Sequence, residues 1–126
     1  MGTILFVDDH HAFRTVMGEV LRLKGYTVLE AGTIADADHI GEHHSRPIDL
    51  LLVEAELTTT NGVEVVRHLA SHYPRLPVLY ISEKSADELM AHHELPAAAK
   101  FLRKPFAAEE LCNQVERLLA FRASAR

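Results

Sequence analysis

Apolar and polar positions follow one another along the chain in an order that predicts strands and helices in turn. Five short, largely apolar runs are bounded by turn-forming residues, which is the pattern of buried strands. They occupy residues 3–7, 26–29, 49–54, 77–81 and 100–103. Between these runs, apolar residues recur at helical spacing. After the first run they are Phe13, Val16, Met17, Val20 and Leu21. The first predicted helix ends at Gly25. The next three cover 33–44, 62–73 and 85–96, and the last begins at Ala107.

This alternation predicts a doubly wound α/β fold, with one five-stranded parallel sheet, helices on both faces and right-handed crossovers. The chain contains no internal repeat or linker, so we expect residues 1–126 to form a single domain. In the fourth helix, Leu89 and Met90 are expected to point inward.

Composition excludes several functions. The chain carries 13 Lys and Arg against 18 Asp and Glu, a net charge of -5, which argues against nucleic-acid binding because phosphate recognition requires a basic surface. No segment approaches the ~20 apolar residues of a membrane span. The single cysteine, Cys112, permits no internal disulfide and indicates a reducing, cytoplasmic setting.

Polar side chains gather where the predicted strands end. Asp8 and Asp9 follow the first strand, Glu54 ends the third, Ser82 follows the fourth and Lys104 follows the fifth. The carboxyl ends of parallel strands share one edge of the sheet, where ligands bind in folds of this type. Packed carboxylates repel one another, so the site requires either Mg²⁺ or the Lys104 ammonium between them.

These residues resemble the receiver domain of two-component response regulators, and the resemblance extends over residues 3 to 120. The family has an acidic pair, an acceptor aspartate, a glycine eight residues later, a Ser or Thr, and Lys-Pro. The matching residues are Asp8-Asp9, Glu54, Gly62, Ser82 and Lys104-Pro105. Residues 47–52 and 101–106 are similar to receivers of hybrid histidine kinases, while residues 8–14 resemble receivers that begin with Asp-Asp-His. The resemblance implies a flavodoxin-like (βα)5 fold with the strands in the order 2-1-3-4-5.

The resemblance also implies a magnesium site. Asp9 and Glu54 would supply side-chain oxygens, Glu56 its backbone carbonyl, and Asp8 would act through a bound water. The ion would be weakly held or absent if the acceptor position is altered.

A switch is implied in the same way. Ser82 would hydrogen-bond a phosphoryl oxygen and Lys104 would pair with it, with the Lys104-Pro105 bond in the cis form. Phe101 matches the aromatic residue that swings inward when the Ser or Thr moves. The signal would reach the face made by the fourth helix, fifth strand and fifth helix, through which receivers also form homodimers.

Two positions depart from the family pattern. Glu54 stands where the family has the phosphorylatable aspartate, and its extra methylene moves the carboxylate forward by roughly 1.5 Å. Phosphoryl transfer depends on positioning, so this shift should cripple acceptance and should place a negative charge where a phosphoryl group would lie. Thr58 stands where the family commonly has proline, which predicts a less rigid loop.

We therefore predict an atypical receiver, not an enzyme, that acts as a phosphorylation-independent interaction module. Its partners would be a histidine kinase, a phosphotransfer protein or a downstream signalling protein. A second hypothesis keeps the phosphorelay, with Asp9, Ser82 or Glu54 accepting phosphate slowly. A third is a small Mg²⁺-dependent phosphohydrolase, although no glycine-rich phosphate loop follows Val7.

Nine histidines are a further feature of the chain. His39 with His43, and His68 with His72, have the i, i+4 spacing at which a helix presents two metal ligands. No cysteine or carboxylate evidently completes either set, so solvated surface positions are the simpler interpretation.

Overall fold

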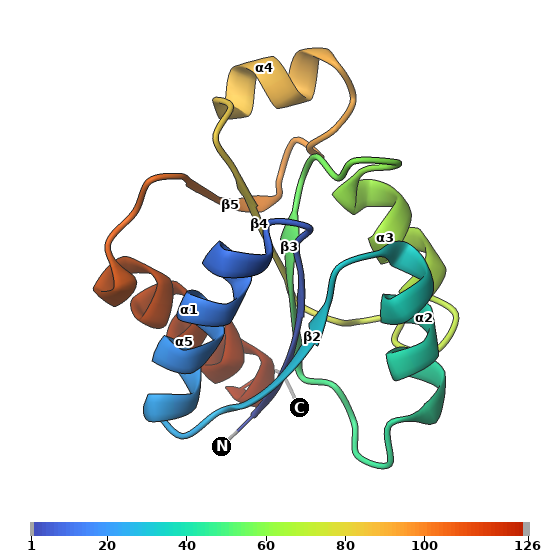
Figure 1. Cartoon of the computed structure of the whole chain (residues 1–126), viewed down its shortest axis with the longest axis vertical. Helices are drawn as coiled ribbons and strands as arrows, with labels where there is room; N and C mark the ends of the chain where they lie inside the picture. Colours follow the sequence, from blue (N-terminus) through green and yellow to red (C-terminus); the bar gives the residue numbers. More distant parts are fainter. Residues whose placement is uncertain (1, 125–126) are drawn as a thin grey trace.

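The computed structural model describes residues 2–124, with side chains through residue 121, and its five strands form one parallel sheet in the order β2-β1-β3-β4-β5 (Figure 1). The strands are β1 (Thr3–Val7), β2 (Thr27–Ala31), β3 (Leu50–Glu54), β4 (Val78–Ser82) and β5 (Lys100–Arg103). The helices are α1 (His11–Leu23), α2 (Ile34–His43), α3 (Gly62–Leu69), α4 (Ala86–Ala91) and α5 (Ala108–Ser124). The predicted doubly wound fold is confirmed.

Helices cover both faces of the sheet, and strand residues alternate between the two layers they create (Figure 1). Leu5, Val7, Leu51 and Val53 pack toward α2, α3 and α4. The intervening residues of the same strands pack toward α1 and α5; they are Ile4, Phe6, Leu50 and Leu52. Because β1 and β3 are buried on both faces, their sequences are continuous apolar runs.

Local sequence signals fix most of the element boundaries. Thr33 and Asn61 cap α2 and α3 by accepting hydrogen bonds from backbone N–H groups three residues later. Ser85 and Glu88 form a reciprocal capping box at the start of α4. Gly25 follows α1 with a φ of 100°, a left-handed conformation that favours glycine.

Four expectations about the elements were wrong. The fourth helix ends at Ala91 and does not reach Pro96, because the chain turns at His93, whose φ is 58°. The second strand continues to Ala31 because its register with β1 extends to the pair Val7 and Ala31. The third helix ends at Leu69, where the chain tightens as His72 N donates to Leu69 O. Met90 is 37% exposed, because successive helix residues point about 100° apart and Leu89 takes the inward position.

Within the described residues, none of the helices has the length and apolar character needed to cross a bilayer.

Candidate functional site

Strand alternation brings three charged side chains to the same side of the sheet. Asp8 is two residues beyond Phe6, Glu54 two beyond Leu52, and Lys104 two beyond Leu102. Those three apolar residues all pack in the layer of α1 and α5. The charges therefore extend this layer at the carboxyl edge of the sheet, as the strand ends predicted.

Lys104 bridges the two buried carboxylates. Its Nζ lies 3.0 Å from Asp8 Oδ2 and 2.8 Å from Glu54 Oε2. The Lys104 side chain is 7% exposed and that of Glu54 4%. The contact with Asp8 is a hydrogen bond, whereas the contact with Glu54 is an ion pair in which Oε2 has no aligned donor. The ammonium also lies 4.0 Å from the centre of the Phe13 ring, a cation–π contact.

Asp8 is held by the start of α1. Its Oδ1 accepts a hydrogen bond from the backbone N–H of His10, at 2.9 Å. Arg14 donates to the Asp8 backbone carbonyl and, through Nε, to Glu30 of β2 at 3.0 Å. These contacts anchor the acidic turn to the neighbouring strand, so Asp8 presents its remaining oxygen to Lys104.

Asp9 contacts the loop that follows β3. The backbone N–H of Thr58 donates to Asp9 Oδ2 at 2.6 Å, and the Thr58 hydroxyl donates to the same oxygen. The sequence predicted a less rigid loop at Thr58. These two hydrogen bonds oppose that effect, because they fix the loop to Asp9. A proline here could make neither bond, since it has no N–H and no hydroxyl.

Two further contacts shape the mouth of the site. Lys84 Nζ donates to Glu56 Oε2 at 2.7 Å, joining the segments that follow β4 and β3. Ser82 is buried, and its hydroxyl accepts from the backbone N–H of Lys84 at 3.1 Å. Among the described residues Glu54 makes no hydrogen bond with Ser82, so its charge is directed at Lys104.

Gly62 provides the close approach behind Glu54. A Cβ at position 62 would lie 2.9 Å from the Glu54 backbone carbonyl and 3.2 Å from the Tyr80 ring. Any side chain here would displace backbone, so glycine allows α3 to begin directly against the end of β3.

The predicted switch residues lie on the opposite side of the sheet. Phe101 packs, partly buried, in the layer of α2, α3 and α4. Ser82 is two residues beyond Tyr80, which packs in that same layer. The Lys104-Pro105 bond is cis, as the resemblance implied.

Burial and pairing shift the protonation of these groups. Burial raises the pKa of Glu54 above its ordinary value; Lys104 opposes this shift and the Asp8 charge adds to it. Burial alone would lower the pKa of Lys104, but its contacts with Glu54 and Asp8 outweigh that effect and raise it. Slight burial opposes ionisation of Asp9, yet the hydrogen bonds from Thr58 lower its pKa.

The donor chemistry of the acidic turn fits a divalent cation. Ligand atoms of Asp8, Asp9 and His10 lie within 4.8 Å of one another. Carboxylate oxygens are the ligands that Mg²⁺ prefers. One oxygen of Asp9 already accepts a hydrogen bond from Thr58. Glu54 faces Lys104, so the ammonium supplies part of the positive charge that a metal would supply.

Sequence reasoning missed the contacts that position this site. Phe13, Arg14, Glu30 and Lys84 were not predicted to take part. The Arg14–Glu30 pair had no local signal, since the two residues are 16 positions apart. The Lys84–Glu56 pair joins two loops whose paths depend on the folded backbone.

Fold and site together define a class: flavodoxin-like domains with acidic residues and a lysine at the carboxyl edge of a doubly wound sheet. The family model of the response regulator receiver domain matches residues 4–116. The chain belongs to this family, whose members bind Mg²⁺ at an acidic pocket and interact with histidine kinases and phosphotransfer proteins in two-component signalling.

Relatives include receivers in long and short proteins. The chain is 30% identical over 120 residues to the sensor kinase CckA of Brucella abortus, covering 94% of the chain but 12% of the kinase. It is 29% identical over 120 residues to the response regulator receiver protein CpdR of the same organism, covering 94% and 98%. The chain thus spans a small part of one relative and nearly all of the other.

Solved structures agree with this assignment. The receiver domain of the hybrid histidine kinase CckA superposes with a TM-score of 0.79 at 30% identity, covering 94% of the chain and 99% of that domain. The Vibrio cholerae chemotaxis protein CheY4 superposes with a TM-score of 0.81 at 24% identity, covering 94% and 98%, and supports the fold.

Proposed function

We propose that residues 1–126 are a single atypical receiver domain whose signalling does not require a phosphoryl group at position 54. The observation that supports this proposal is the ion pair between Glu54 and Lys104. Lys104 is the cation that the family resemblance assigns to the phosphoryl group, and here the side-chain carboxylate of Glu54 contacts it from the acceptor position.

Two physical arguments connect this ion pair to function. Phosphoryl transfer depends on positioning the acceptor oxygen, and the added methylene moves it by roughly 1.5 Å. Glu54 also imitates a phosphorylated aspartate only in part. It has one charge and two oxygens, against about -1.5 to -2 charge and three oxygens for a phosphoryl group.

The domain then acts as an interaction module and not as an enzyme. Its proposed partners are a histidine kinase, a phosphotransfer protein or a downstream signalling protein in the cytoplasm, with no nucleic acid or membrane contact. Homodimers would form through the face of α4, β5 and α5, where Met90 is exposed. Light scattering after size-exclusion chromatography, at several concentrations, measures this association.

Mg²⁺ is proposed to bind weakly. Asp9 and the Glu56 carbonyl would supply oxygens, Asp8 would act through water, and Glu54 would contribute only after leaving Lys104. When bound, the ion supplies positive charge that lowers repulsion between the carboxylates.

Labelling with acetyl phosphate and Mg²⁺ tests the proposal, read promptly because acyl phosphates hydrolyse. The matched variants are Glu54→Asp, which restores the family's acceptor, and Glu54→Ala, which removes it. We expect no stoichiometric phosphate on wild type or Glu54→Ala, and clear labelling of Glu54→Asp. Stoichiometric labelling of wild type that disappears in Glu54→Ala contradicts the proposal.

The same experiment separates the alternatives. Label that persists in Glu54→Ala and maps to Asp9 or Ser82 supports a phosphorelay through another acceptor. Turnover of p-nitrophenyl phosphate that Asp9→Asn abolishes supports a phosphohydrolase.

A further inference from the structure

Imidazole and carboxylate side chains form two facing pairs between α2 and α3. His68 Nδ1 lies 2.8 Å from Asp38 Oδ2, and His72 Nε2 lies 3.9 Å from Glu42 Oε1. Asp38 and Glu42 are four residues apart on α2, and His68 and His72 are also four apart. The two pairs therefore follow one another along the helices, one turn apart.

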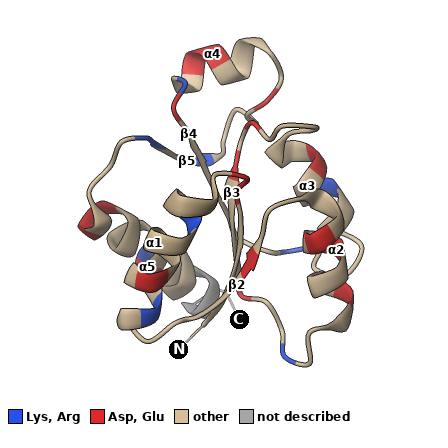
Figure 2. Ribbon diagram, in the orientation of Figure 1, with Lys and Arg blue, Asp and Glu red and all other residues tan. Residues whose placement is uncertain are grey.

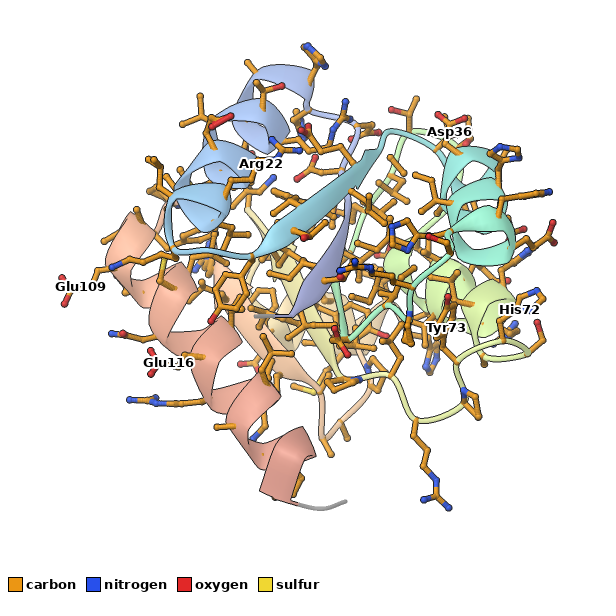
Figure 3. All side chains as sticks on the ribbon, turned by 90° about the horizontal axis from the view of Figure 1, so that it is seen from below. Arg22, Asp36, His72, Tyr73, Glu109 and Glu116 are labelled. Carbon is orange, nitrogen blue, oxygen red and sulfur yellow. The ribbon has the colours of Figure 1, made fainter. Side chains whose placement is uncertain are left out.

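A close helix contact creates this arrangement. Gly41 is buried in α2, and a Cβ there would lie 2.7 Å from Leu69 Cδ2 of α3. Tyr73, beside His72, donates its hydroxyl to the Gly41 carbonyl at 3.3 Å. Figure 3 shows His72 and Tyr73 together where the chain leaves α3, next to α2.

The chain after α3 keeps a helical path far enough to present His72. Ala70 N donates to Val66 O, and Tyr73 N donates to Leu69 O, each four residues back. His72 thus keeps its place one turn beyond His68, although α3 itself ends at Leu69.

We propose that Asp38, Glu42, His68 and His72 form a binding site for a divalent transition-metal ion of the zinc type. Two imidazoles and two carboxylates are a ligand set that Zn²⁺ accepts. The sequence showed no carboxylate partners for His68 and His72. Helix α2 supplies them as Asp38 and Glu42.

Within each pair, the two donor atoms lie near the spacing that such an ion requires. Two donor atoms on a tetrahedral zinc lie about 3.3 Å apart, given bonds of about 2.0 to 2.1 Å. The contacts of 2.8 and 3.9 Å bracket that value. Among the described residues only the acidic turn already holds three ligand atoms within 4.8 Å, so this set must rotate to converge. All four side chains are 32% to 52% exposed, which leaves them free to do so.

Local charge also favours a cation here. Helix α2 carries the carboxylates of Asp36, Asp38 and Glu42 and no Lys or Arg (Figure 2). Arg67, the basic residue of α3, is paired with Glu64 at 2.8 Å. This site lies in the helix layer opposite α1 and α5, so its occupancy is independent of the charge at Glu54.

Calorimetric titration of the tag-free full chain with Zn²⁺ tests the site. We expect one strongly bound ion per chain, with affinity at least about tenfold weaker in His68→Ala or in His72→Ala, since even outer partners of a metal ligand are worth that much. His39→Ala and His43→Ala are matched controls, because that stacked i, i+4 pair lies on α2 alone. Asp9→Asn controls for the acidic turn.

Absorption of the Co²⁺-loaded chain gives a second measurement, in which visible bands of tetrahedral cobalt should appear in wild type and vanish in His68→Ala. The proposal is overturned if Zn²⁺ does not bind, if His68→Ala and His72→Ala bind it as wild type does, or if His39→Ala, His43→Ala or Asp9→Asn removes the bound ion instead. Circular dichroism of each metal-free variant confirms that it is folded before titration.

Discussion

Thr58 donates two hydrogen bonds to one oxygen of Asp9, a residue 49 positions earlier in the chain. The loop after β3 is thereby fixed to the acidic turn after β1. One oxygen that a metal would use is occupied by the protein's own donors.

Removing these donors should strengthen Mg²⁺ binding. Thr58→Val keeps the N–H and deletes the hydroxyl, whereas Thr58→Pro deletes both. We expect Mg²⁺ affinity to rise in the order wild type, Val, Pro, while each lost bond lowers the free energy of unfolding by about 1 kcal/mol. Calorimetry with Mg²⁺ and urea unfolding provide the two measurements. Equal affinity in all three proteins would show that Thr58 does not compete with the ion.

Lys104 should be essential for stability. Lys104→Met leaves Asp8 and Glu54 buried without a counter-charge, which typically costs about 3 to 5 kcal/mol. Urea unfolding measures this loss. Adding Glu54→Gln to Lys104→Met should recover part of it, because one of the two stranded charges disappears. Lys100→Met, an exposed lysine on β5, is the control and should change stability by no more than about 0.5 kcal/mol.

Glu54 should make stability depend on pH. Burial raises its pKa above the 4.5 of an ordinary glutamate. Between 4.5 and the raised value the folded protein binds a proton that the unfolded chain does not, so this contribution to stability is lost as pH rises. Relative to Glu54→Gln, wild type should therefore lose stability as pH increases from about 4.5. A difference that stays constant or grows with pH would contradict the raised pKa. The lowered pKa of Asp9 affects stability only below its ordinary value of 3.8. Asp9 is also present in both proteins, so it does not contribute to their difference above that pH.

Two glycines should respond oppositely to alanine. At Gly62 the new Cβ would lie 2.9 Å from backbone, and overpacking of this kind costs about 1 to 3 kcal/mol. At Gly18, in the interior of α1, the nearest atoms would be side-chain atoms at 3.4 Å, an ordinary contact. Gly18→Ala should therefore be neutral or stabilising by up to about 1 kcal/mol. Thermal or urea unfolding of both variants checks the contrast.

The sequence predicted what depends on the period of a strand. The apolar runs located the buried strands, and their final polar residues located Asp8, Glu54 and Lys104, because side chains alternate along a strand and parallel strands end at one edge. The Ser85–Glu88 capping box and the Thr33 cap act through neighbours three residues away, so such signals are also visible in sequence.

What escaped prediction depends on how separate elements approach one another. Phe13 lies against Lys104, and Thr58 against Asp9, only because α1 and the loop after β3 follow particular paths. His68 likewise faces Asp38 because α2 and α3 approach closely at Gly41. The spacing of residues along either helix does not reveal this approach.

The division of the site between the two faces of the sheet has a consequence for evolution. Asp8, Glu54 and Lys104 extend the layer of α1 and α5, while Phe101 packs in the other layer. A change of acceptor chemistry in the layer of α1 and α5 leaves the packing of Phe101 in the other layer untouched. Under the proposed function, acceptor chemistry at position 54 and aromatic packing at position 101 can therefore change independently in evolution.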